Sequence, residues 1–183
     1  HITKLLPYVS GNYMIIDSSS RRNLELVETL REKQKRGSLL WVLDKTKTAM
    51  GARTLRSYLE QPLIDKEEIE KRLTAIEELN SQMITREELR EYLNPIYDLE
   101  RLIGRISYQT ANPRDLIAFK ASLEMLPSIR TLLTELKSPL MQEILEELDP
   151  LEDLHRLVEE SILEEPPIYI HDGNMIRDGY NTD

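Results

Sequence analysis

The sequence predicts a mainly α-helical, multi-helix domain with a short N-terminal strand and a small C-terminal β-hairpin. Residues that can cap helices recur along the chain, each followed by apolar residues at helical spacing. At three of these starts proline follows the cap directly, where its missing N–H costs nothing. Strand-like sequence is confined to residues 13–17 and 168–177. We therefore expect a linker, or the end of an upstream connection, over residues 1–12, a helical core over 13–165 and a hairpin over 166–183.

The first predicted elements follow that linker. Tyr13–Asp17 is short, apolar and partly β-branched, which indicates a brief strand. Asp17 and Ser18 then supply side-chain oxygens that can cap a helix, which we expect to end at Gly37. The apolar face of this helix carries Leu24, Val27 and Leu30, and its last turns carry Arg31, Lys33, Lys35 and Arg36. These cations can stabilise the negative, C-terminal end of the helix dipole. Contact with DNA phosphate is an alternative role for them.

Caps and prolines divide the next part of the chain. Cap-like starts at Asp65 and Thr85 each precede an apolar helical face, and Pro95 breaks the second helix. The helix after Pro95 contains Gly104, which we expect to allow a close helix contact. A further helix starts at Asn112-Pro113.

The last predicted helices use the same devices. Pro127 should kink or divide the helix that starts at Asn112. Two more helices are expected to start at Ser138-Pro139 and Asp149-Pro150, and Pro166-Pro167 ends the helical part. Ile168–His171 and Asn174–Arg177, joined by Asp172-Gly173, are then expected to pair as a hairpin with a tight turn.

The formal net charge of −9 is unevenly distributed along the chain. Residues 1–60 carry +5, residues 61–120 carry −3 and residues 121–183 carry −11. An acidic C-terminal third repels phosphate, so any DNA contact should involve the N-terminal third. Solvated helix faces explain the same gradient without a ligand.

Composition limits the class of protein. No apolar run exceeds five residues, which excludes a membrane-spanning helix, and the start HITKLLPYV does not resemble a signal peptide. The chain has no cysteine, so it has no disulfide framework and no thiolate metal site, which fits a cytoplasmic protein. Because the first residue is His1 and not methionine, we expect the sequence to be part of a longer chain.

Catalytic and nucleotide-binding patterns are missing from the sequence. The three histidines, His1, His155 and His171, are far apart, and helix capping accounts for the hydroxyl groups of Ser18–Ser20. The six glycines form no phosphate-binding loop between a strand and a helix. We therefore expect no catalytic, metal or cofactor site in this chain.

The most distinctive stretch is Ser38–Leu63, SLLWVLDKTKTAMGARTLRSYLEQPL. It contains the only tryptophan, Trp41, and Thr48 can cap a helix that Pro62 stops. Gly51 lies in the first turn of that helix, where glycine costs about 1 kcal/mol relative to alanine. We therefore expect another backbone segment to pass close to Gly51.

This stretch resembles the core of the MutS family of DNA mismatch repair proteins. Three other blocks are similar to the same family in order and spacing: MIIDSSSRRNLEL (Met14–Leu26), DLERLIGRI (Asp98–Ile106) followed by NPRDL (Asn112–Leu116), and PPIYIHDGNMIRDGYN (Pro166–Asn181). One departure is Asn174, which stands where the family pattern has a second glycine.

The resemblance implies a mechanical role. It implies the first half of the core, or lever, domain, which ends before the clamp and links connector, clamp and ATPase parts. In the full-length family, ATP and Mg²⁺ bind elsewhere, so this segment is not itself an enzyme. The implied partners of the full-length protein are mismatched double-stranded DNA, the rest of its own chain, a second subunit of a homodimer and a MutL-type repair protein. The candidate structural or coupling residues are Thr48, Met50, Gly51, Arg53, Leu55 and Pro62.

Two alternatives stay open from the sequence. The first is the same core in the endonuclease-bearing MutS paralogue, which lacks mismatch recognition. The second is a free-standing helical scaffold that binds protein partners. Which residues touch DNA is unknown at this level.

Overall fold

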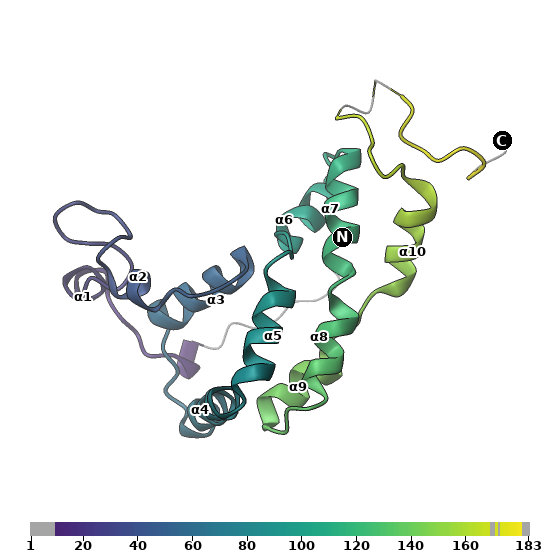
Figure 1. Cartoon of the computed structure of the whole chain (residues 1–183). Coiled ribbons are helices and arrows are strands. Elements are labelled where there is room, and N and C mark those ends of the chain that lie inside the picture. Colours follow the sequence, from purple (N-terminus) through teal and green to yellow (C-terminus); the bar gives the residue numbers. More distant parts are fainter. Residues whose placement is uncertain (1–9, 169–170, 172, 181–183) are drawn as a thin grey trace. The chain divides into compact units, whose positions relative to one another are not determined.

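Every regular element in the described part of the chain is a helix (Figure 1). The structure is a computed structural model that describes residues 10–168, 171 and 173–180. The predicted mainly helical class is therefore confirmed. The helices are η1 (Ser10–Asn12), α1 (Ser18–Asn23), α2 (Leu39–Leu43), α3 (Ala49–Glu60), α4 (Lys66–Ser81), α5 (Met83–Leu93), α6 (Leu99–Ser107), α7 (Pro113–Leu123), α8 (Leu126–Leu133), α9 (Pro139–Glu147) and α10 (Glu152–Ser161).

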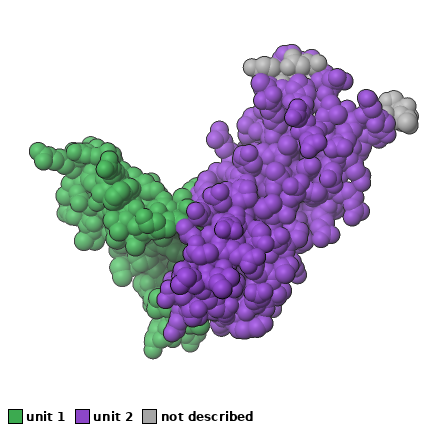
Figure 2. Space-filling view, viewed as in Figure 1, with its two compact units in different colours: residues 1–46, 51–74 green, residues 47–50, 75–183 purple. Residues whose placement is uncertain are grey.

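The chain divides into two compact units, shown in different colours in Figure 2. Unit 1 comprises residues 1–46 and 51–74, and unit 2 comprises residues 47–50 and 75–183. The chain passes between the units after Thr46, then inside α3 after Met50, and again inside α4 after Thr74. The expected boundaries at residues 12 and 165 stay predictions.

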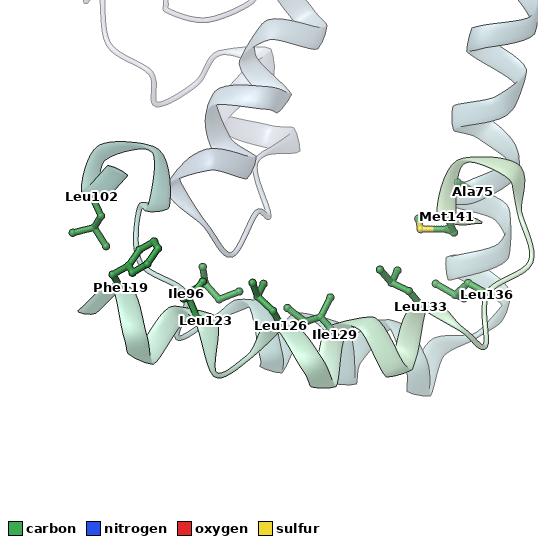
Figure 3. Packing of buried hydrophobic residues seen from close by; sticks show 10 residues of the cluster. All are labelled: Ala75, Ile96, Leu102, Phe119, Leu123, Leu126, Ile129, Leu133, Leu136 and Met141. Carbon is green, nitrogen blue, oxygen red and sulfur yellow. The ribbon is translucent and has the colours of Figure 1, made fainter. Parts of the chain in front are cut away.

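Unit 2 is built around α7 and α8. Helices α6 and α10 pack against α7, and α5 and α9 pack against α8. Buried apolar side chains recur every three or four residues along α7 and α8, so they share one face (Figure 3). Burying one leucine fully contributes about 1.5–3 kcal/mol, so this row is the main source of stability in unit 2. The buried cluster comprises Ala75, Ile96, Leu102, Phe119, Leu123, Leu126, Ile129, Leu133, Leu136 and Met141.

The predicted basic helix over residues 18–36, in unit 1, is wrong. Helix α1 ends at Asn23, and the next residues form turns, with Glu25 and Lys33 in the left-handed region at φ 48° and φ 49°. The carbonyl groups of Glu25 and Leu26 accept hydrogen bonds from the first amides of α2. These bonds to α2 replace the ones that would have continued the helix, so tertiary pairing overrides the helical pattern.

The predicted N-terminal strand is wrong. Only Tyr13 forms a β-bridge, with Leu63, and the flanking Met14 N–H donates to the Pro62 carbonyl at 2.7 Å. Pro62 has no N–H to return, and α1 begins at Ser18, so the pairing does not extend into a ladder.

The predicted C-terminal hairpin is also not seen. Its residues 169, 170 and 172 lie outside the described residues. The described part of the second segment pairs with the end of α10: Ile176 bridges Ile162, and the Leu163 N–H donates to the Met175 carbonyl at 2.9 Å. A more distant partner in sequence has therefore taken the hydrogen-bonding groups that the hairpin required.

Several helix boundaries agree with the sequence, and two do not. Asn112 caps α7 with a complete capping box, and α7 ends before the division at Pro127 as predicted. Thr85 does not start a helix as predicted. Only Gln82 separates α4 from α5, so α5 already begins at Met83 and Thr85 lies inside it. Leu151 precedes α10 in the left-handed region at φ 51°, so this helix begins two residues after Pro150.

Gly104 does not mediate a close helix contact. A Cβ atom built on Gly104 would meet no atom within 4 Å among the described residues.

Among the helices of the described residues, none is long and apolar enough to cross a membrane.

Candidate functional site

The signature stretch begins at α2, a five-residue helix held firmly at its start. Ser38 is fully buried; its hydroxyl donates to the Lys35 carbonyl at 2.6 Å and accepts from the Trp41 N–H at 3.3 Å. Leu40 is the one buried residue of the helix, and its N–H donates to the Leu26 carbonyl at 2.8 Å. The Ser38 cap and the contacts of Leu40 together hold α2 in place, although the helix is only five residues long.

Asp44 ties the end of α2 to the preceding loop. One carboxylate oxygen is bonded to the Lys35 ammonium group, and the other accepts from the Thr46 hydroxyl at 2.6 Å and the Thr46 N–H at 3.2 Å. The hydrogen bond from Lys35, followed by that from the Thr46 hydroxyl, lowers the pKa of Asp44 from 3.8 to about 2. Asp44 is thus held as a carboxylate and acts as a structural anchor.

Helix α3 carries the candidate coupling residues. It begins at Ala49, directly after Thr48, and ends at Glu60, two residues before Pro62, as the sequence predicted. Among the candidates, Arg53 is exposed, whereas Thr48, Met50, Gly51, Leu55 and Pro62 are partly buried. Met50 packs against the buried cluster of unit 2, whereas the residues from Gly51 onward belong to unit 1.

The rest of α3 is fastened within unit 1. The Arg72 guanidinium of α4 lies over the Tyr58 ring, 3.7 Å from its centre. Glu60 is paired with Arg56 at 3.2 Å and with Arg21 of α1 at 3.5 Å. The carbonyl group of Pro62 accepts the hydrogen bond from the Met14 N–H, so the segment before α1 pairs with the end of the signature stretch.

Two of the sequence blocks meet in one hydrogen-bonded cluster. Arg105, from DLERLIGRI, pairs with Asp115, from NPRDL, with 2.9 Å between Nη1 and Oδ1. The second carboxylate oxygen of Asp115 accepts from the Asn112 N–H at 2.8 Å, and the Asn112 side chain accepts from the Asp115 N–H at 2.9 Å. The sequence predicted the cap and the following proline at Asn112-Pro113. It identified neither Asp115 as the second half of a capping box nor Arg105 as the partner of Asp115.

A second cross-link that the sequence did not reveal involves Glu78 of α4. Its carboxylate accepts from the backbone N–H groups of Lys137 and Ser138, the latter at 2.9 Å. Partial burial raises the pKa of Glu78, but these hydrogen bonds from Lys137 and Ser138 outweigh it and lower the pKa overall. The carboxylate therefore satisfies two amides at the start of α9, where a helix leaves them unpaired.

The described residues contain no group of three or more histidine, cysteine, aspartate or glutamate side chains that could hold a metal ion. His155 lies at a boundary, with its side chain 25% exposed and its Nε2 atom 3.2 Å from Glu124 Oε1. Caps, ion pairs and buried apolar contacts are the interactions that hold the described residues together.

Comparison with known proteins decides the family. The sequence profile described as "MutS domain III" matches residues 19–181. The chain belongs to the MutS family. It is the core domain, domain III, and the predicted resemblance is confirmed.

Relatives of this MutS domain III match along its whole length. The chain is 66% identical over 183 residues to the DNA mismatch repair protein MutS of Lachnoclostridium phytofermentans, covering 100% of this chain and 20% of that protein. It is 51% identical over 181 residues to the protein of the same name from Caldanaerobacter subterraneus, covering 99% of this chain and 21% of that protein. With the MutS of Staphylococcus epidermidis, it shares 46% identity over 182 residues, 100% of this chain and 21% of the relative. The chain therefore spans about a fifth of the length of the curated relatives that it matches.

Proposed function

We propose that this domain III links the connector, clamp and ATPase parts of a DNA mismatch repair protein. In this role it transmits nucleotide-dependent changes to the parts that hold DNA. The observation that carries the proposal is the position of the signature stretch. Helix α3 continues across the division between the two units, between Met50 and Gly51.

The candidate residues lie on both sides of that division. Thr48 and Met50 belong to unit 2, and Gly51, Arg53, Leu55 and Pro62 belong to unit 1. A continuous helix can carry a displacement along its length, because its backbone hydrogen bonds connect each turn to the next. Coupling also requires an element with two arrangements, whose equilibrium both ligands change.

We place the whole protein's chemistry outside this chain. ATP and Mg²⁺ are bound by the ATPase part, and mismatched double-stranded DNA, a second subunit and a MutL-type protein are partners of the longer chain. The relatives' name, DNA mismatch repair protein MutS, favours this role over that of the endonuclease-bearing paralogue. The match to domain III likewise favours a part of a larger machine over a free-standing scaffold.

Exposed apolar side chains support a role within a larger protein. Ile76, Met83 and Ile84, at the α4–α5 junction, are 61%, 62% and 84% exposed. Apolar groups gathered on a surface generally mark an interaction site. We propose that other parts of the longer MutS chain cover this junction.

The test compares two glycine substitutions in the full-length protein. Gly51→Leu places a side chain where we expect close packing, and Gly104→Leu is the matched control because its Cβ faces open space. Release of mismatched DNA on ATP addition should slow with Gly51→Leu and be normal with Gly104→Leu. The separate affinities for nucleotide and for mismatched DNA should change less than the release rate. Equal release rates in both variants would contradict the coupling role of Gly51.

A further inference from the structure

The loop that leads into α2 carries four cations that do not belong to a helix (Figure 1). They are Arg31, Lys33, Lys35 and Arg36. The sequence predicted them in the last turns of a helix, where the helix dipole would account for them. Helix α1 ends at Asn23, so the dipole does not explain these cations in the structure. All residues from 31 to 37 are exposed, and we call this segment the basic loop.

Hydrogen bonds and a glycine fix the backbone of the basic loop. The Thr29 N–H donates to the Gln34 carbonyl at 3.0 Å, and the Thr29 carbonyl accepts from the Lys33 N–H at 3.1 Å. Gly37 has a φ of 91°, and a Cβ atom there would lie 3.2 Å from Thr29 Cγ2, which favours glycine at this turn. Because the backbone is already held, little of its entropy would be lost when a partner binds.

Three cations of the basic loop have no partner in their own chain. Lys35 is engaged, because its ammonium group is bonded to Asp44. Within the described part of the chain, the side chains of Arg31, Lys33 and Arg36 form neither a hydrogen bond nor an ion pair. Cations of unit 1 that do have a partner include Arg21, Arg56, Lys66 and Arg72. The basic loop therefore holds positive charge that is available to an anionic partner.

Lys33 has a backbone conformation that lysine rarely adopts. Its φ of 49° lies in the left-handed region, which glycine and asparagine adopt more readily. Formation of the turn alone therefore favours glycine or asparagine at this position. Residues held in such conformations are concentrated at sites that bind ligands. A partner for the ammonium group would account for a lysine here.

The composition of the basic loop favours nucleic acid over protein as the partner. None of its seven side chains is apolar, whereas the centre of a protein–protein interface is apolar and depleted in charge. Interfaces with nucleic acid are more polar and more positively charged. Arginine also presents its N–H groups as a fork that fits two phosphate oxygens. The one carboxylate of the loop, Glu32, is bonded to the side-chain amide of Gln34.

We infer that the basic loop binds the phosphate backbone of double-stranded DNA, with Arg31, Lys33 and Arg36 each contacting a phosphate group. Contacts to phosphate carry no sequence information, so the loop does not distinguish a mismatched duplex from a matched one. With only three such contacts, binding is weak and decreases steeply as salt is added. The loop lies entirely within unit 1, so this inference does not depend on the proposed coupling role of α3.

The salt dependence of binding counts these contacts. Binding of the chain to a short, matched DNA duplex is followed by fluorescence anisotropy of the labelled duplex at a series of salt concentrations. Each phosphate contact contributes about −0.9 to the slope of log K against log salt concentration. The triple variant Arg31→Gln, Lys33→Gln, Arg36→Gln should therefore have a slope less steep than that of the parent by about 2.7, and each single substitution by about 0.9. All three side chains are exposed, so the far-UV circular dichroism of the parent should be kept.

The matched control removes the same charge from three exposed positions outside the basic loop, Arg22→Gln, Lys47→Gln and Arg101→Gln. It should change the slope by less than one contact, about 0.9. Poly-glutamate with the same number of charges as the duplex tests the rival partner, an acidic protein surface, and should bind more weakly than DNA. The inference is overturned if the loop variant keeps the parent slope, if the control reduces the slope equally, or if poly-glutamate binds as tightly as the duplex.

Discussion

Replacing Asp115 by asparagine should destabilise unit 2 measurably, although the two side chains have the same shape. Asp115 is 12% exposed, and its carboxylate serves Arg105 with one oxygen and the Asn112 N–H with the other. Asparagine offers only one acceptor oxygen, because its NH₂ group is a donor. Either Arg105 or the Asn112 N–H therefore loses its acceptor.

The expected loss follows from the two interactions. A cap interaction contributes about 0.5–2 kcal/mol, and a partly exposed ion pair contributes about 0.2–1 kcal/mol. Arg105 is 37% exposed, so water compensates part of its loss. We expect Asp115→Asn to lower the free energy of unfolding by about 1–2 kcal/mol, or the melting temperature by about 2–4 °C per kcal/mol.

The matched control is Asp65→Asn. Asp65 is exposed, and its carboxylate accepts a hydrogen bond from the Glu68 N–H at 3.0 Å. Asparagine caps helices about as well as aspartate, so this change should alter stability by less than about 0.5 kcal/mol. Both variants are compared with the parent by urea unfolding followed by far-UV circular dichroism. Equal midpoints for the two variants would refute the assigned role of the Arg105–Asp115 pair.

Three further predictions follow from packing, titration and charge. Leu123, 2% exposed in the buried cluster, should cost about 2–5 kcal/mol when changed to alanine, whereas the exposed Leu154→Ala should cost much less in the same thermal melts. The pKa of Asp44 is lowered to about 2, so its stabilising contribution is complete above about pH 4 and is lost as the pH falls towards 2. Because Lys35 is partly exposed, we expect the Asp44 carboxylate to contribute about 1 kcal/mol to the free energy of unfolding. Asp44→Asn should remove this pH dependence from urea unfolding monitored by Trp41 fluorescence. The chain alone should bind DNA weakly and without preference for a mismatch, since its basic surplus is confined to residues 1–60; a mobility shift that favours a mismatched duplex at physiological salt would contradict this.

Local signals predicted the parts of the fold that depend on a few neighbouring residues. Asn112-Pro113 and Ser138-Pro139 fixed helix starts because a cap and a following proline act within one turn. Residues 24–36 were mispredicted because the amides of α2 bind the carbonyl groups of Glu25 and Leu26, a pairing that no local pattern records. The hairpin failed for the same reason, since Ile176 pairs with Ile162 and not with a near neighbour.

The sequence predicted where the candidate site lies along the chain, but it did not predict which residues contact one another there. The stretch around Gly51 was found by its signature, and the helix start at Asn112-Pro113 by its cap and proline. The partners Arg105 of Asp115 and Lys137 of Glu78 were not found, because single charged residues on helix faces carry no indication of what they meet after folding. The close packing expected at Gly51 stays a prediction.

The central claim is that α3 responds to both ligands of the full-length protein. Hydrogen exchange of the backbone amides of residues 49–60 tests it most directly, measured in the full-length protein alone, with ATP, with mismatched DNA and with both. The claim predicts that ATP and mismatched DNA each change the exchange rates in α3, and that their combined effect differs from the sum of the two. Exchange rates in α3 that are the same in all four states would contradict it.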